Sequence, residues 1–383
     1  MKPFTIIILL LLTTAGYGQD RSFAIKTIDT LTSPYFWGRG YTKNGMKKAA
    51  LFLAKELASY GVKPLDGKSF FQEYELSVNT FPEDMKLEIN GIKLKPGYDF
   101  IVGPASRGTE AKGKLVKKDS LNYVDPANRI LVTLENKLTW SVAREVADFT
   151  SIHIDKKAIK STPENIKVEI DNRFIPNFKA ANVSGIVKGT QLPDSIIFIT
   201  AHYDHLGGMG QEVYFPGAND NASGVALLLD LARYYTNHRP AYSIGFILFS
   251  AEEAGLLGSK YFTDNPLVDL SRIRFLINLD LTGTGDEGIT VVNATEFKQE
   301  FDLIRKINDE HNYLNQVNPR GKAANSDHYW FSEKKVPAFF IYTMGGIKAY
   351  HDVYDVAKTL PLSSYDNLFR LIRDYNNKLM NSK

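Results

Sequence analysis

The stretch SIIFITAHYDHLG (residues 195–207) decides how the second half of this chain folds. Residues 195–201 are an apolar run with the length of a buried strand, and polar residues follow at once. Further apolar runs lie at 243–250, 272–281, 289–293 and 337–343, and segments with helical apolar spacing, such as 222–237, lie between them. Buried strands that alternate with helices predict an α/β fold, a three-layer sandwich with a mainly parallel central sheet.

Metal-binding side chains stand where these predicted strands end. Function collects at the carboxyl ends of the strands in such a sheet, so we expect these side chains to meet. Two histidines and three carboxylates form an N/O ligand set that suits Zn²⁺, with Mn²⁺ or Co²⁺ as possible substitutes. The candidate ligands are His202, Asp220, Glu253, Asp280 and His351.

Most of these residues also have an ordinary structural role open to them. Asp220, in the turn GANDNASG (217–224), is the best candidate for a ligand shared by two metals, but Asp is also a common helix N-cap. Asn221 and Ser223 could cap equally well, which would free Asp220. His202 could be a core histidine, but Asp204, two residues on, could accept its other N–H and fix its tautomer.

The pair Glu252-Glu253 offers two carboxylates with different roles. One can bind metal while the other, Glu252, takes a proton from water as general base. An EE pair is usually an exposed helix start, yet this one directly follows an apolar strand. Asp280 interrupts the apolar run LINLDL, where a carboxylate is costly to bury unless it is paired or metal-bound.

The remaining polar residues are open to two interpretations each. Tyr350 is either a packed aromatic or a hydroxyl donor to a developing oxyanion. Asp355 could orient His351, and Ser326-Asp327-His328 either lines the pocket or caps a turn. We expect His205 to be a bystander in its loop. His153, His238 and His311 are expected at the surface.

The first half of the chain contains a leader and an insertion. Residues 1–18, with Lys2 and an apolar run from Phe4 to Leu12, predict a signal peptide and a secreted or periplasmic protein. A leading helix is expected at 43–60. Residues 79–178 are predicted to form a small, mostly β inserted domain, with a hairpin at Asn90-Gly91 and one helix at SVAREVADF (141–149). The main domain is then formed by 19–78 and 179–383. The alternative is that 79–178 is a set of long loops on this main domain.

Composition excludes several classes of protein. Net charge is +3 and the charges are interspersed, so nucleic-acid binding has little support. The chain has no cysteine, which excludes a disulfide framework and a lipid-modified N-terminal cysteine. We expect no membrane contact after signal cleavage. The oligomeric state is not readable.

The motifs HYD, GANDNASG, SAEEAGLLGS, NLDLTG and YHDVYD resemble, in order and spacing, the co-catalytic di-zinc aminopeptidases of metallopeptidase family 28, relatives of bacterial leucyl aminopeptidases and glutamate carboxypeptidase. The resemblance covers about 180–380 and implies a zinc exopeptidase, phosphorylase/hydrolase-like fold. It implies two Zn²⁺: His202 and Asp280 on one, Glu253 and His351 on the other, and Asp220 between them. It also implies Glu252 as general base, Asp204 as the partner of His202, and a cis peptide after Asp220.

The resemblance leads to one main functional hypothesis and two alternatives. The main one is a secreted zinc aminopeptidase that cleaves N-terminal residues from peptides with a metal-bound hydroxide. Tyr350 would polarise the carbonyl, because Ala323 occupies the family's other tyrosine position. The 79–178 segment would be a divergent protease-associated domain. The alternatives are a glutaminyl cyclase, which typically has Trp before the last histidine, and an inactive binding protein that has lost ligands.

Overall fold

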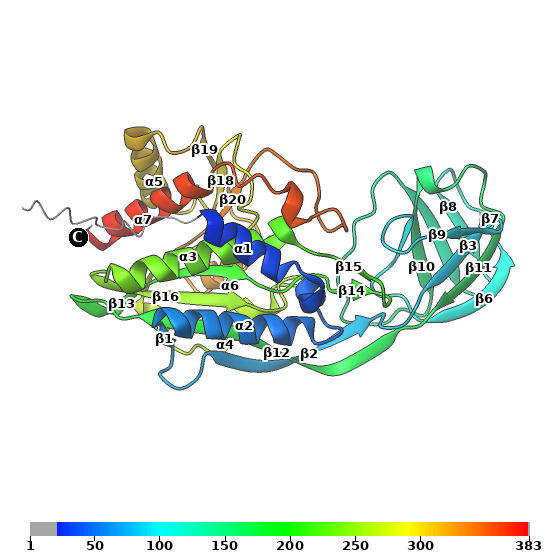
Figure 1. The fold of residues 1–383 in the computed structure, drawn as a ribbon, viewed down its shortest axis with the longest axis horizontal. Coiled ribbons are helices and arrows are strands. Elements are labelled where there is room, and N and C mark those ends of the chain that lie inside the picture. The colour runs from blue at the N-terminus through cyan, green and yellow to red at the C-terminus, as the bar shows by residue number, and fades with distance from the viewer. Residues whose placement is uncertain (1–20, 382–383) are drawn as a thin grey trace, which may run out of the picture.

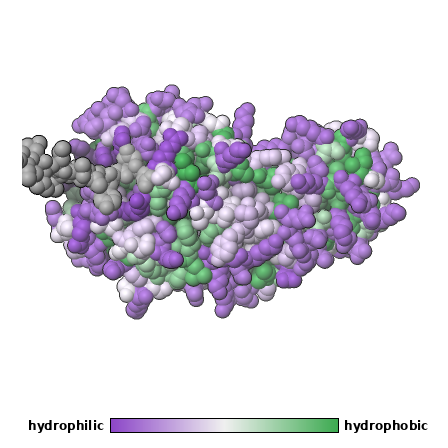
Figure 2. Space-filling model, in the orientation of Figure 1, coloured by the Kyte–Doolittle hydropathy of each residue, from purple (hydrophilic) through white to green (hydrophobic). Residues whose placement is uncertain are grey.

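The computed structural model describes residues 21–381, and the predicted signal peptide lies outside them. Two parts are visible in Figure 1: a body of helices packed on a long sheet, and a smaller β-rich part at the right. We call residues 81–172, which form the smaller part, the insert. Figure 2 shows hydrophilic residues spread over both parts, as the interspersed charges predict.

The central sheet of the body is mixed. Its four middle strands, β16, β13, β17 and β20, run parallel, and antiparallel strands flank them on both sides. The expected α/β sandwich is therefore present, with its parallel part at the centre. The strand order is β1 (Lys63–Pro64), β12 (Arg173–Val187), β16 (Tyr242–Phe249), β13 (Leu192–His202), β17 (Ile273–Leu279), β20 (Ala338–Thr343), β18 (Ile289–Val292) and β19 (Val317–Pro319), while β2 (Phe71–Thr80) pairs with β12.

Helices bury both faces of the central part of this sheet, which explains why β16, β17 and β20 are mainly apolar and buried. In β13, Ile197 and Ile199 contribute to the larger core, and Ile196 and Phe198 contribute to the smaller one. The larger core lies under α1 (Arg21–Leu31), α2 (Gly45–Tyr60), α3 (Gly224–Asn237), α5 (Lys298–His311) and α7 (Tyr365–Asn381). The smaller core lies under α4 (Leu257–Asp264) and α6 (His328–Glu333).

The insert contains two sheets of its own. One has the order β5 (Phe100–Val102), β10 (Thr150–Asp155), β9 (Ile130–Glu135), β8 (Asn122–Asp125), β7 (Val116–Lys117). The other has the order β4 (Ile92–Leu94), β3 (Lys86–Ile89), β11 (Asn165–Ile170), β6 (Thr109–Lys114). The predicted hairpin is present, with Asn90 and Gly91 at positive φ between β3 and β4.

The prediction of a helix at 141–149 is wrong. This segment is irregular, with bends, and lies beside β2, where the carbonyl of Ala143 accepts the amide of Asn79 and the carbonyl of Arg144 accepts the hydroxyl of Ser77. Carbonyls that bond to a neighbouring strand are not available to a helix, so tertiary contacts override the local apolar spacing. Among residues 21–381, no helix has the length and apolar character to cross a membrane.

Candidate active site

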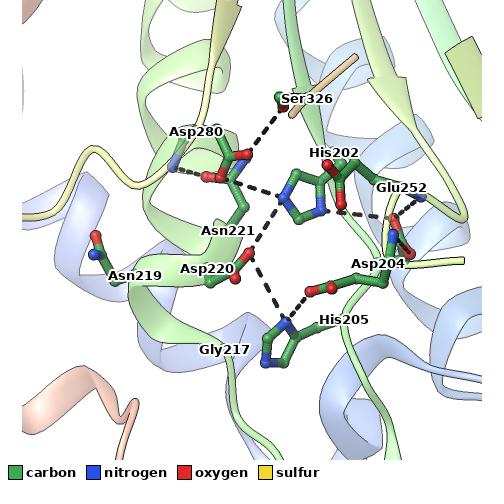
Figure 3. Close-up of polar contacts among 12 residues, drawn as sticks. His202, Asp204, His205, Gly217, Asn219, Asp220, Asn221, Glu252, Asp280 and Ser326 are labelled. Carbon is green, nitrogen blue, oxygen red and sulfur yellow. Dashed lines mark hydrogen bonds and ion pairs between the residues drawn. The ribbon is translucent and has the colours of Figure 1, made fainter. Parts of the chain in front are cut away.

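The five predicted ligands converge at the carboxyl edge of the parallel strands. Figure 3 shows three of them, His202, Asp220 and Asp280, pointing toward one another. His202 is the last residue of β13, Glu253 follows β16, and Asp280 follows β17. Asp220 lies in the turn before α3, and His351 lies in the loop after β20. The site therefore collects residues that are up to 149 positions apart in the sequence (351 − 202), as the parallel topology predicts.

Asp220 lies between the two histidines. Its Oδ1 is 3.2 Å from Nε2 of His202, and its Oδ2 is 3.1 Å from Nε2 of His351. The peptide bond from Asp220 to Asn221 is cis, as the resemblance implied. Asn221 Oδ1 accepts the amide of Gly224 at the start of α3, so the cap is supplied by Asn221 and Asp220 faces the site.

His202 and Asp280 form one side of the site. His202 Nε2 is 3.3 Å from Asp280 Oδ1. The other oxygen of Asp280 accepts the hydroxyl of Ser326 at 3.0 Å. The hydroxyl of Ser326 in turn accepts a hydrogen bond from the side-chain amide of Asn278. Ser326 therefore helps to fix a candidate ligand.

Glu253 and His351 form the other side, and a third histidine joins them. His351 Nε2 is 3.1 Å from Glu253 Oε2. His205 Nδ1 donates to Glu253 Oε1 at 2.7 Å, and the His205 side chain is fully buried. The expectation that His205 is a bystander is wrong, because the turn after β13 directs its side chain inward over Gly217.

Asp204 is buried beside His202 and holds the backbone of the EE pair. Its carboxylate accepts the amides of Glu252 and Glu253 at 3.1 and 3.3 Å. His202 Nδ1 is 3.6 Å from Asp204 Oδ1, longer than a hydrogen bond. Ala251, just before the pair, has a φ of 54°, a value uncommon for residues other than glycine. These contacts fix where Glu252 and Glu253 leave the strand.

The expectation that Asp355 orients His351 is wrong. Asp355 accepts the backbone amides of Asn219 and Asp220 at 2.9 and 3.0 Å. The partner of His351 is the carbonyl of Trp140 in the insert, 3.0 Å from its Nδ1. A carbonyl oxygen only accepts, so Nδ1 carries a proton, and Nε2 is the nitrogen that faces the other candidate ligands.

Arg39 supports the Asp220 turn from behind, and the sequence analysis missed it. The guanidinium is fully buried and donates to the carbonyls of Tyr203, Leu31, Pro216, Gly217 and Asp220 at 2.7–3.2 Å. Burial lowers its pKa to about 10, so it remains charged at neutral pH. Its position between two glycines in WGRGY (37–41) was the only sequence signal of a special backbone.

Tyr350 and the segment 326–328 have distinct surroundings. The Tyr350 ring stacks on His351, with 4.0 Å between centroids, and the side chain is exposed. Asp327 is fully buried, and burial raises its pKa to about 7. His328 is buried against Phe340. His153, expected at the surface, is half-buried and paired with Glu135 on the insert.

The charge of the cluster fits divalent cations. The side chains of Asp204, Asp220, Glu253 and Asp280 expose at most 9% of their surface. Carboxylates this close are costly to bury unless positive charge compensates them. Although burial lowers it, Glu253 and Asp220 raise the pKa of His351 to about 11, which shows how strongly the cluster attracts positive charge. Oxygen and imidazole donors with this spacing suit Zn²⁺.

Glu252 differs from Glu253 in its protonation. Desolvation raises the pKa of Glu252 well above the ordinary value, and the neighbouring carboxylate of Glu253 adds to the effect. The pKa of Glu253 falls to about 2, because His351 and His205 outweigh its burial and its repulsion by Asp220. Of the two carboxylates, Glu252 therefore holds a proton more readily.

The sequence of the body matches a known family. Residues 182–376, half of the chain, match the model of Peptidase family M28. Aminopeptidase YwaD of Bacillus subtilis is 30% identical over 195 residues, which are 46% of this chain and 41% of the relative. Leucine aminopeptidase 2 of Trichophyton equinum is 26% identical over 348 residues, which are 80% of this chain and 68% of the relative. The matched stretch thus spans less than half the length of YwaD.

Solved structures share the fold over most of the chain. A Peptidase M28 precursor from Shewanella amazonensis has a TM-score of 0.72 at 17% identity and 94% coverage of both chains. A zinc aminopeptidase from Bacillus subtilis has a TM-score of 0.68 at 19% identity, covering 92% of this chain and 94% of its own. The chain belongs to Peptidase family M28.

Proposed function

We propose that this chain is a secreted zinc-dependent exopeptidase, an aminopeptidase that removes N-terminal residues from peptides. The observation that carries the proposal is Asp220, whose two carboxylate oxygens face two different histidines at 3.2 and 3.1 Å. A carboxylate in that position is suited to hold two metal ions together. Relatives named as aminopeptidases support the same reaction class.

The residues divide into two ligand groups and a base. His202 and Asp280 would hold one zinc ion, Glu253 and His351 the other, and Asp220 both. When bound, the two ions polarise the scissile carbonyl and lower the pKa of water. Glu252 takes the proton of the attacking water and delivers it to the leaving amine. Tyr350, which is exposed and stacks on His351, would donate its hydroxyl to the carbonyl oxygen.

The alternatives lose support. The relatives named above are peptidases, and the comparisons give no support to a glutaminyl cyclase. An inactive binding protein would have lost ligands or the base, and this chain retains every residue to which the resemblance gives those roles. The proposed secretion is supported only by the signal-peptide pattern of residues 1–18.

A Glu252→Gln variant tests the mechanism. We expect it to keep two zinc ions per chain and to hydrolyse an aminoacyl anilide about 10²–10⁴-fold more slowly, because the general base is lost. Glu310→Gln, an exposed glutamate of α5, is the matched control and should keep parental turnover. Parental turnover in Glu252→Gln would contradict the role of Glu252.

A peptide panel tests the exopeptidase mode. Free N-terminal peptides should be shortened from that end, and N-acetylated forms of the same peptides should be resistant. Cleavage of the blocked peptides would contradict the aminopeptidase assignment. Zinc analysis that found no metal would contradict the proposed site.

A further inference from the structure

The loop that carries His351 is held by the insert. Trp140 and His351 form a reciprocal pair: the amide of Trp140 donates to the carbonyl of His351 at 2.9 Å, and the His351 ring donates to the carbonyl of Trp140 at 3.0 Å. Both the backbone and the imidazole of His351 are thus fixed by one residue of the insert.

Lys137 adds a second attachment to the same loop. Its ammonium donates to the carbonyls of Lys348 and Tyr350 at 2.9 and 3.2 Å and lies 3.2 Å from Asp352 Oδ2. Asp352 accepts the amide of Tyr354, so Lys137 binds a carboxylate that already shapes the loop. The contacts of Lys137 and Trp140 therefore extend over residues 348–352.

Trp140 also joins this loop to both parts of the protein. Its indole Nε1 donates to the carbonyl of Val102 in β5 of the insert at 2.7 Å. Its ring stacks on Phe215, with 4.7 Å between centroids and 24° between planes. Phe215 lies two residues before Gly217 and the Asp220 turn.

The apolar core of the insert continues into the body at this point. Phe100, Val102 and Ile152 belong to the same cluster of buried side chains as Leu206, Phe215 and Val353, which come from the loops around the site. A buried apolar contact of this kind makes the insert and the site loops one packed unit, so displacing the insert would displace the His351 loop.

The His351 loop is a place where such support matters. His351 has a φ of 52°, an uncommon conformation for a residue with a side chain. Gly345 and Gly346, which precede it, also have positive φ. A segment with these backbone angles persists when surrounding contacts hold it.

We infer that Lys137 and Trp140 of the insert are positioning residues of the metal centre, and that they set the zinc affinity of the half formed by Glu253 and His351. The inference rests on the proposed zinc site. Groups that hold a metal-binding histidine commonly contribute about 10–100-fold in metal affinity.

Zinc-loaded full-length protein tests this with Lys137→Met and Trp140→Ala. Competition with a chromophoric chelator should show one zinc ion held about 10–100-fold more weakly in Trp140→Ala and less severely in Lys137→Met, with the other zinc unchanged. Trp140→Phe keeps a ring against Phe215 and loses the bond to Val102, so its loss should be intermediate. Lys86→Met, which removes an exposed 2.8 Å ion pair of the insert with Glu169, is the matched control.

Two further variants assign the weakened zinc ion. In a His351→Ala background, Lys137→Met should cause no additional loss of zinc affinity, whereas in a His202→Ala background it should still cause one.

Hydrogen exchange of the peptide 344–355 in metal-free protein should be faster in Trp140→Ala than in the parent. This measurement reports how firmly the insert holds the His351 loop, without metal or activity.

The outcomes are distinguishable. Variants that hold both zinc ions as the parent does, or that lose both equally, would overturn the inference and leave the proposed function standing. A parent protein that binds no zinc would overturn the proposed function and the inference with it.

Discussion

Nδ1 of His205 lies 2.7 Å from Oε1 of Glu253, and both side chains are buried at the centre of the candidate site. Oε2 of the same carboxylate faces His351, so the contact with His205 fixes the orientation of the Glu253 carboxylate toward His351. A group that holds a ligand in this way contributes to metal affinity without touching the metal.

His205→Phe should therefore weaken zinc binding by about 10–100-fold, because Glu253 loses the donor that orients it. Zinc titration of the purified variant measures the effect. His153→Phe is the matched control. Nδ1 of His153 lies 2.6 Å from Oε1 of Glu135 on the insert, so this histidine also pairs with a glutamate but is not near the predicted ligands. Equal affinities in the parent and His205→Phe would contradict the role of His205.

Arg39→Met should destabilise the protein by roughly 3–5 kcal/mol, as expected when one side of a buried charged network is removed. Five backbone carbonyls would lose their donor. Arg39→Lys should rescue little, because an ammonium cannot reach five acceptors arranged around a planar guanidinium. Urea unfolding of the zinc-loaded protein measures the free energy of unfolding. A variant as stable as the parent would show that the carbonyls find other donors.

Removal of metal should lower the melting temperature. The buried carboxylates repel each other without cations, and a ligand that binds only the folded state stabilises it by about 2.7 kcal/mol at 100 times its Kd. Thermal unfolding with a chelator, and again after zinc is restored, measures the change. An unchanged melting temperature would argue against an ion at this site.

Stability should fall with acid in part through His328. Burial lowers the pKa of His328 to about 3, from an ordinary value of 6.5. The folded state therefore holds this imidazole neutral, and its contribution to stability is complete above pH 6.5 and is lost as pH falls from 6.5 towards 3. The loss is roughly 1.4 kcal/mol per pH unit within that window.

His328→Phe, which keeps a ring next to Phe340, should lose stability less steeply between pH 6.5 and 4. The difference between its slope and that of the parent isolates the contribution of His328 from the other acidic groups. Chemical denaturation at several pH values measures both slopes, and parallel slopes would contradict the burial effect.

The sequence was informative where chemistry and strand pattern coincide. Apolar runs located the central strands, and the strand ends located His202, Glu253 and Asp280, because parallel topology brings such ends together. The direction of a loop side chain carries no such pattern. The sequence predicted His205 to be a bystander in its loop and Asp355 to orient His351, and only the turns around them show otherwise.

Long-range partners were also beyond the sequence. Arg39 acts through main-chain carbonyls that are 8 to 181 residues away. The irregular path of 141–149 depends on its hydrogen bonds with β2, which override its own helical spacing. Neither relationship is visible in local composition.

The contact of Trp140 with His351 passes through a main-chain oxygen, which every residue type possesses. Substitution at this position keeps the acceptor atom but removes the indole contacts that hold it, so the effect on His351 is transmitted through the main chain. Relatives that share the device would reveal it only when their backbones are superimposed. An exchange of inserts between such proteins would succeed only where the new insert brings a main-chain oxygen to the same place and holds it there with equivalent side-chain contacts.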